Sequence, residues 1–194
     1  MQQHHKKGPK RTTRDRNDRY ETPDEEIDVV LQAMYPDSFE GPILEPACGS
    51  GRMVRRIRKY TGQKVIGRDL EDTGHDWLKT TRKWKGDMIT NPPYHKDMPL
   101  QFALKAHELV DGQFAMLLQA GFLWTDTRAP YLRGILKPDQ VIIIPWRIYF
   151  YRRNGKRIEG QAYSHCWVIW PDRIHRGIPG DQRKTKITIA ERSS

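Results

Sequence analysis

The stretch that most constrains the fold of this chain is Ile43-Leu-Glu-Pro-Ala-Cys-Gly-Ser-Gly51, an apolar run that enters a turn with two glycines. Glycine adopts the backbone conformations of a tight turn and lets a ligand approach the main chain closely. The pattern predicts a strand, a turn and a helix over about 52–60, followed by a strand at 64–67. Asp69 ends that second strand, eighteen residues after Gly51, where an acidic side chain can bind a ribose diol.

Alternation of apolar strands and amphipathic helices continues along the chain. We expect helices after a Thr22–Glu25 capping box and over 99–110, and strands at 87–89, 114–118, 141–144 and 164–170. Asn154-Gly155 predicts a hairpin between the last two strands. Because such alternation favours a parallel sheet with helices on both faces, we expect a doubly wound Rossmann-like α/β fold, mostly parallel with an antiparallel terminal hairpin strand.

Positive charge is concentrated in particular segments. The net charge is +10, of which residues 1–19 contribute +5 and residues 172–194 contribute +3, while residues 128–157 carry eight Lys and Arg and one Asp. Such segments favour a polyphosphate partner through counterion release, although they also occur as solvated surfaces. We expect a flexible basic arm at 1–19, one domain at 20–171 and a basic tail at 172–194.

Several classes of protein are disfavoured by composition. The sequence contains no apolar run long enough for a membrane helix and no secretory signal at its start. Its two cysteines, Cys48 and Cys166, read as reduced thiols, and its histidines lack the spacing of a metal site. We therefore expect a cytoplasmic protein without a membrane or metal partner.

The glycine turn favours a particular kind of ligand. Neither the third glycine of a dinucleotide fingerprint nor the lysine of a P-loop follows Gly51. A carboxylate at Glu45 would repel a pyrophosphate but would suit an ammonium group. These points favour an adenosyl ligand without phosphates, and the alternative is an ordinary strand–turn–helix connection that binds nothing.

The second unusual stretch is Asn91-Pro-Pro-Tyr94, directly after the strand at 87–89. Prolines fix their own φ and keep the preceding residue extended. The Asn91 side-chain oxygen and the Pro92 carbonyl are then rigid acceptors for the two N–H groups of an exocyclic amine, and Tyr94 offers a ring on which a base can stack. The alternative is a turn that only ends a strand. We interpret the residues that follow, His95, Lys96 and Asp97, as loop residues rather than bases.

The glycine turn and Asn91-Pro-Pro-Tyr94 together resemble the S-adenosylmethionine-dependent N6-adenine DNA methyltransferases. Tyr20-Glu-Thr-Pro23 is similar to the N-terminal cofactor motif of that family. Gly74-His-Asp-Trp-Leu78 is similar to its motif whose Asp contacts the adenine amine of the cofactor. The likeness covers about residues 20–120, in the family's gamma order of motifs.

This resemblance implies S-adenosylmethionine as cofactor and adenine in DNA as substrate, methylated by base flipping and direct displacement. The implied catalytic residues are Asn91, Pro92, Pro93 and Tyr94. The implied cofactor-binding residues are Tyr20, Thr22, Pro23, Glu45, Pro46, Ala47, Gly49, Gly51, Asp69, Leu70, Asp76, Trp77 and Asn91. Since only about ten residues separate Leu78 from the catalytic strand, we expect no separate target-recognition domain. We therefore expect the enzyme to recognise a short DNA sequence or to have relaxed specificity, as small stand-alone enzymes of phages and prophages do.

Other activities remain open. The Asn-Pro-Pro-Tyr motif is also similar to that of release-factor glutamine methyltransferases and of some RNA methyltransferases acting on adenine or guanine. A nucleic-acid-binding protein on a degenerate methyltransferase fold is a further alternative. Candidate nucleic-acid contacts are Arg128, Arg152, Arg153, Lys156 and Arg157, although a solvated basic hairpin would look the same. The sequence does not distinguish a monomer from a dimer.

Overall fold

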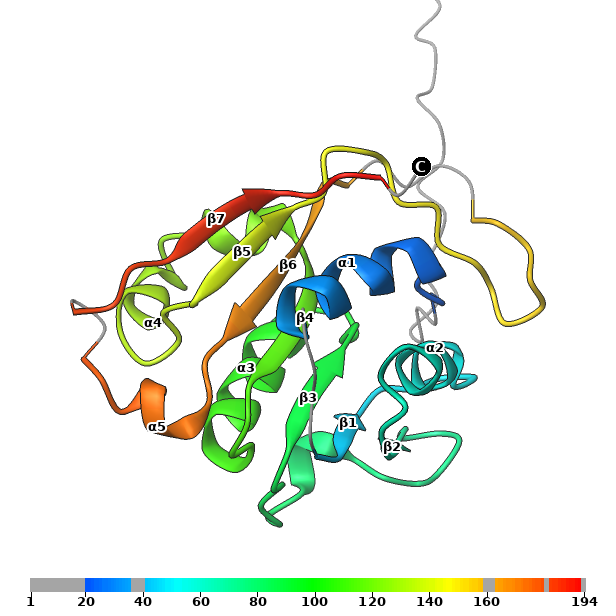
Figure 1. Ribbon diagram of the computed structural model, residues 1–194, viewed down its shortest axis with the longest axis horizontal. Coiled ribbons are helices and arrows are strands. Elements are labelled where there is room, and N and C mark those ends of the chain that lie inside the picture. The colour runs from blue at the N-terminus through cyan, green and yellow to red at the C-terminus, as the bar shows by residue number, and fades with distance from the viewer. Residues whose placement is uncertain (1–19, 36–40, 159–162, 180–181, 193–194) are drawn as a thin grey trace, which may run out of the picture.

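The computed structural model describes residues 20–35, 41–158, 163–179 and 182–192. They form a seven-stranded sheet in the order β2-β1-β3-β4-β6-β5-β7 (Figure 1). The strands are β1 (Ile43–Glu45), β2 (Val65–Gly67), β3 (Asp87–Thr90), β4 (Phe114–Gln119), β5 (Gln140–Ile143), β6 (His165–Trp170) and β7 (Lys186–Ile189). All neighbours pair in parallel except β6, which is antiparallel to both β4 and β5. The predicted mostly parallel α/β sheet with an antiparallel strand is confirmed, although that strand lies inside the sheet.

Helices cover both faces of the sheet. On one face, α1 (Asp24–Met34) and α2 (Arg52–Thr61) bury apolar residues such as Leu31 and Ile57 against the sheet, and on the other α3 (Met98–Leu109) does so with Phe102. The remaining elements are short: η1 (Trp77–Lys79), η2 (Ala120–Leu123), α4 (Ala129–Arg133) and α5 (Arg173–Arg176). Between β2 and β3 the chain forms only η1, so no α-helix of the described residues follows β2 before β3 begins.

Two local predictions are wrong. Pro23, not Thr22, is the N-cap of α1, and no side chain caps the helix, because the Thr22 hydroxyl is bonded elsewhere. Asn154-Gly155 does form a tight turn, closed by a 2.8 Å bond from the Arg152 N–H to the Lys156 carbonyl. Its arms, however, form isolated bridges rather than the ends of β5 and β6. A proline after Ile144 explains this, since proline cannot donate to a strand ladder.

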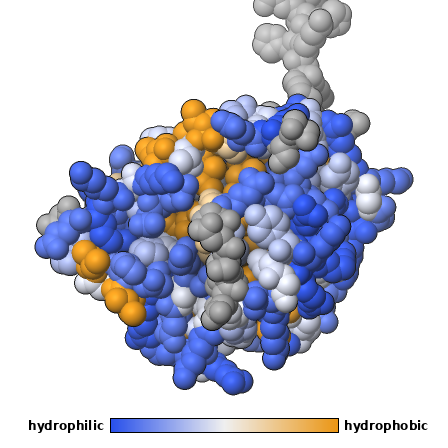
Figure 2. Space-filling model, viewed as in Figure 1, coloured by the Kyte–Doolittle hydropathy of each residue, from blue (hydrophilic) through white to orange (hydrophobic). Residues whose placement is uncertain are grey.

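The C-terminal segment is more than a tail. Residues 172–194, expected to be a basic tail, contain α5 and the edge strand β7, which pairs in parallel with β5. The alternation of Lys186-Ile-Thr-Ile189 fits this edge position, where Ile187 and Ile189 stay exposed beside Ile143. Figure 2 shows hydrophobic side chains gathered over β5 and β7 on an otherwise mainly hydrophilic face. The expected basic arm at 1–19 lies outside the described residues.

A buried carboxylate joins α1 to the start of two strands. Asp87, at the first position of β3, accepts a 2.8 Å hydrogen bond from the Tyr35 hydroxyl and a 2.9 Å bond from the Gln113 N–H. Burial raises the pKa of the Asp87 carboxyl, and these two donors oppose that rise. The side chain therefore has a structural role, below the edge where β1 and β3 end.

Replacing Tyr35 by Phe should lower the free energy of unfolding by about 1–3 kcal/mol, because one carboxylate oxygen of Asp87 loses its buried donor. Urea unfolding followed by circular dichroism measures the change. The matched control is Tyr131→Phe, which alters an exposed tyrosine and should shift stability by less than about 0.5 kcal/mol. Equal stability of Tyr35→Phe and the native protein would contradict this account of Asp87.

Candidate functional site

A cavity of about 430 Å³ lies where the loops after β1, β2 and β3 meet the chain that precedes α1. Because these strands are parallel, their carboxyl ends meet at one edge of the sheet, where α/β proteins bind ligands. Most of the residues proposed from the resemblance line it: Tyr20, Thr22, Glu45, Pro46, Ala47, Gly49, Asp69, Leu70, Asp76, Trp77, Asn91, Pro92, Pro93 and Tyr94. Pro23 and Gly51 do not; they are the N-caps of α1 and α2.

The glycine turn has the geometry expected of it. Gly49 and Gly51 have φ of 49° and 81°, in the left-handed region that favours glycine. The Gly49 N–H donates to the Asp69 carboxylate at 3.0 Å, and the Cys48 N–H donates to the Arg68 carbonyl at 2.9 Å. These bonds hold the turn after β1 against the loop after β2, so both sides of the cavity are rigidly connected.

Glu45 is a buried acid without a cationic partner among the described residues. Only 1% of the residue is exposed, and its Oε1 accepts hydrogen bonds from the Ala47 N–H at 3.0 Å and the Thr90 hydroxyl at 2.5 Å. Burial raises the pKa of the Glu45 carboxyl to about 8, with a smaller rise from the nearby Asp69 carboxylate. No Lys or Arg in the described part of the chain forms a salt bridge with it. A ligand with a positive charge would stabilise the ionised form, so the site fits an ammonium group.

Asp69 and Asp76, the two other acids predicted to bind the cofactor, accept hydrogen bonds from backbone N–H groups of their own loops. Asp69 accepts from three backbone N–H groups, those of Gly49 at 3.0 Å, Glu71 at 3.0 Å and Asp72 at 3.3 Å. Asp76 accepts from the Leu78 N–H at 3.0 Å as the N-cap of η1. A carboxylate has about four acceptor positions, so each keeps capacity for a ligand. Their roles toward a ribose and an adenine amine remain predictions.

Asn91 is held by hydrogen bonds at both ends of its amide. Its Nδ2 donates to the Thr22 hydroxyl at 3.1 Å, and its Oδ1 lies 2.6 Å from the Tyr94 hydroxyl, which donates to it. That hydroxyl also lies 2.8 Å from the Leu117 carbonyl oxygen. The amide orientation is thereby set, with the oxygen toward Tyr94 and one acceptor position left for another donor.

The Tyr94 ring is fixed from behind by His165. The two rings meet edge to face with centroids 5.9 Å apart, and His165 packs in the same way on Phe150 at 5.1 Å. Burial lowers the pKa of His165 to about 4, so its imidazole is neutral at physiological pH. Sequence reasoning did not connect His165 with this site, because the contact depends on β6 pairing with β4.

Several lining residues were missed or interpreted differently from the sequence: Glu21, Cys48, Ser50, Arg52, Met53, Glu71, His75, His95, Lys96, Met98, Phe102 and Arg153. Arg153, a candidate nucleic-acid contact, pairs with Asp72 at 2.6 Å beside the cavity, and its role toward nucleic acid remains a prediction. The bridge between Glu21 and Tyr151 brings this distant segment to the site. No short-range signal could have revealed that pairing.

The other basic candidates divide into two groups. Arg128 lies over the Phe122 ring at 5.0 Å and 3.9 Å from the Asp97 carboxylate, and Arg157 lies over the Tyr149 ring at 3.3 Å. Arg152 and Lys156 are exposed at the turn.

The described residues include no group of three or more His, Cys, Asp or Glu side chains placed to hold a metal ion. None of the helices in the same ranges has the length and apolar character needed to cross a membrane.

The chain matches known proteins by its structure and not by its sequence. No family model and no curated protein matches its sequence. A type I restriction-modification methyltransferase subunit from Streptococcus thermophilus matches 79% of this chain and 45% of its own length, at 15% identity with a TM-score of 0.58. A candidate RNA methyltransferase from Pyrococcus horikoshii matches 80% of this chain and 87% of its own, at 14% identity with a TM-score of 0.57.

A third similar structure is the 23S rRNA methyltransferase ErmE, at 14% identity and a TM-score of 0.50 over 77% of this chain and 69% of that chain. The present chain spans less than half of the restriction-modification subunit but most of the two RNA-related proteins. At such low identity the likeness establishes the fold. The chain has the Rossmann-like α/β fold that these three methyltransferases share.

Proposed function

We propose that this protein transfers a methyl group from S-adenosylmethionine to the N6 amine of adenine in DNA. The observation that carries the proposal is the position of Asn91-Pro-Pro-Tyr94, which lines the same cavity as Glu45 and the glycine turn. A motif suited to grip an amine and a site suited to an adenosyl cation thus share one space. Neither an ordinary connection nor a strand-ending turn requires that juxtaposition.

The cofactor would be held by groups from three loops. Glu45 would bind its ammonium group, Asp69 its ribose, and Asp76 with Trp77 its adenine. When bound, S-adenosylmethionine provides an electrophilic methyl group on a sulfonium centre. The buried Glu45 carboxyl is the strongest sign of fit, because its raised pKa reflects the cost of burying a charge without a partner.

The acceptors around Asn91 suit a weakly nucleophilic amine. The lone pair of an aromatic amine is delocalised into the ring, and accepting hydrogen bonds from its two N–H groups localises that pair on nitrogen. The Asn91 Oδ1 and the Pro92 carbonyl would accept these bonds, and Thr22 prevents the amide from turning its NH₂ end to the substrate. Acceptors that are already in place need no reorganisation during the reaction. After transfer the extra proton can leave to water, so no basic side chain is needed.

Nucleic acid is the favoured substrate because of the net charge of +10 and the aromatic residues at the site. Trp124 is 79% exposed in the loop after β4, close to the Arg128–Asp97 contact that joins this loop to the one after Tyr94. An extruded adenine could stack there or on Tyr94, and extrusion is needed because the amine is unreachable inside a duplex. Methylation of RNA or of a protein glutamine by the same motif is the alternative.

The substrate can be identified by incubating the protein with radiolabelled S-adenosylmethionine and DNA, RNA or protein, then analysing the hydrolysed product. We expect label in N6-methyladenine from DNA. Asn91→Ala should lower kcat by about 100- to 1,000-fold, because a preorganised acceptor is lost. The control is His95→Ala, which alters the same cavity but should retain activity within a few-fold. Label in glutamine, or none in any substrate, would refute the proposal.

Binding of S-adenosylmethionine at pH 7 should release close to one proton. The free Glu45 carboxyl, with a pKa of about 8, is mostly protonated at that pH, and an ammonium partner favours its ionised form. Isothermal titration calorimetry in two buffers of different ionisation enthalpy measures the release. Glu45→Gln should bind more weakly and release no such proton, whereas Asp76→Asn should retain the release. The same release from Glu45→Gln would rule out this assignment.

Thr22→Val should lower kcat about tenfold, because removing one hydrogen bond of about 1.4 kcal/mol frees the Asn91 amide to rotate. The dissociation constant of S-adenosylmethionine should change less than twofold. Thr22→Ser keeps the hydroxyl and should restore kcat. A weaker cofactor affinity with unchanged kcat would instead indicate that Thr22 binds the cofactor directly and does not position Asn91.

A further inference from the structure

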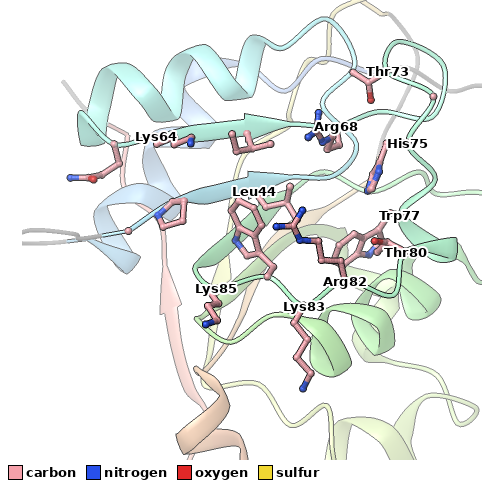
Figure 3. A pocket seen from close by; sticks show the side chains of 16 residues that line it. Leu44, Lys64, Arg68, Thr73, His75, Trp77, Thr80, Arg82, Lys83 and Lys85 are labelled. Carbon is pink, nitrogen blue, oxygen red and sulfur yellow. The ribbon is translucent and has the colours of Figure 1, made fainter.

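A second and larger cavity, of about 1,000 Å³, lies beside β1 and β2 (Figure 3). Its walls are β2 with its flanking residues and the segment 73–85 that returns to β3. We call it the basic groove, after the five cationic residues that line it: Lys64, Arg68, Arg82, Lys83 and Lys85. His75 and Trp77 line both this groove and the first cavity, so one loop separates the two.

The charge of the basic groove is unbalanced. No Asp or Glu is among its lining residues, and all five cationic residues are exposed. None of the five side chains forms a salt bridge or a hydrogen bond with the described part of the chain. Elsewhere Arg52, Arg56 and Arg173 each pair with an aspartate. Unpaired like charges gathered in a hollow attract anions to it.

The base of the groove is apolar and rigid. Leu44 and Ile66 come from the strands, and Trp84 is fixed by a 2.9 Å bond from its indole N–H to the Asp87 carbonyl. The backbone N–H of Trp84 donates to the Leu109 carbonyl at 2.8 Å, and this bond connects the segment to the end of α3. The cationic side chains therefore project from a fixed frame, as Figure 3 shows for Lys64 and Arg68 at opposite ends of β2.

The spread of the charges indicates an extended ligand. Lys64 and Arg68 are four residues apart on an extended segment, or about 13 Å at 3.3 Å per residue. Arg82, Lys83 and Lys85 lie along the facing segment. A single phosphate could not contact cations so far apart, whereas a chain of phosphates could contact several.

We propose that the basic groove binds the phosphodiester backbone of a nucleic acid, as a contact surface separate from the methyl-transfer cavity. The proposal rests on the proposed function in taking nucleic acid as the substrate. Repeating negative charge and base faces that can contact Trp84 favour nucleic acid over an acidic protein segment. Because phosphate contacts carry no sequence information, such a surface would suit an enzyme with relaxed specificity.

The test is a triple variant, Lys64→Gln with Arg68→Gln and Lys83→Gln, which neutralises three exposed cations of the groove. Its matched control is Lys59→Gln with Arg133→Gln and Lys186→Gln, three exposed cations that do not line it. Fluorescence anisotropy of a labelled short duplex, and of one of its strands, gives the dissociation constant between about 50 and 200 mM salt. Thermal unfolding should be unchanged in both variants, since all six sites are exposed.

The groove variant should bind at least about tenfold more weakly. The slope of log K against log salt, which is negative, should decrease in magnitude by about 2–3, near 0.9 per lost duplex contact. Its cofactor affinity, and its kcat at saturating nucleic acid, should match the native protein, with only KM raised. Equal weakening in the control variant would overturn the proposal. So would groove-dependent binding of polyglutamate without groove-dependent binding of nucleic acid.

These outcomes separate the groove from the catalytic proposal. If the native protein methylates no nucleic acid but binds it through the groove, the proposed function fails and the groove assignment stands. If methylation of DNA is found and the groove variant keeps the native KM and salt slope, only the groove assignment fails.

Discussion

The parallel pairing of β2, β1 and β3 is the constraint on which the rest of this structure depends. Parallel strands end at the same edge, so the residues after them meet although they are separated by many positions in the chain. Glu45, Asp69 and Asn91 each follow or end one of these strands and line a single cavity. Tyr35 and Gln113, bonded to the buried Asp87, hold the start of β3 in place below that edge.

Two electrostatic features of the structure favour charged ligands: the buried Glu45 carboxyl and the cations of the basic groove. Among the residues that the structure describes, Glu45 is a buried acid without a cationic partner, and the five exposed cations of the basic groove form no salt bridge. Burying an isolated charge is costly, so the Glu45 carboxyl would ionise readily only beside a cationic partner. The cavity lined by Glu45, whose carboxyl is mostly protonated without a ligand, and the basic groove lie on either side of one loop, at His75 and Trp77. A cationic cofactor and a polyanionic substrate would satisfy them separately.

Much of the fold could be predicted because its signals are local. Apolar runs, glycine turns and helical spacing located the central strands and the three longer helices within a few residues. The edge strand β7 was missed because the basic residues around Lys186 suggested a tail, although its alternation fits an edge. The hairpin at Asn154-Gly155 was misplaced, since a turn signal does not reveal whether its arms join a sheet.

The sequence by itself determined the chemistry available at the site: a carboxylate before a glycine turn, an acid after the second strand, and Asn91 locked before two prolines. Their covalent order and backbone restrictions are local properties. Only the tertiary structure decided how these groups are held, because hydrogen bonds between distant residues depend on packing. In the folded chain the Thr22 hydroxyl bonds to Asn91 and does not cap the helix, and His165 packs behind Tyr94. The cations around β2 form no salt bridge within the described ranges.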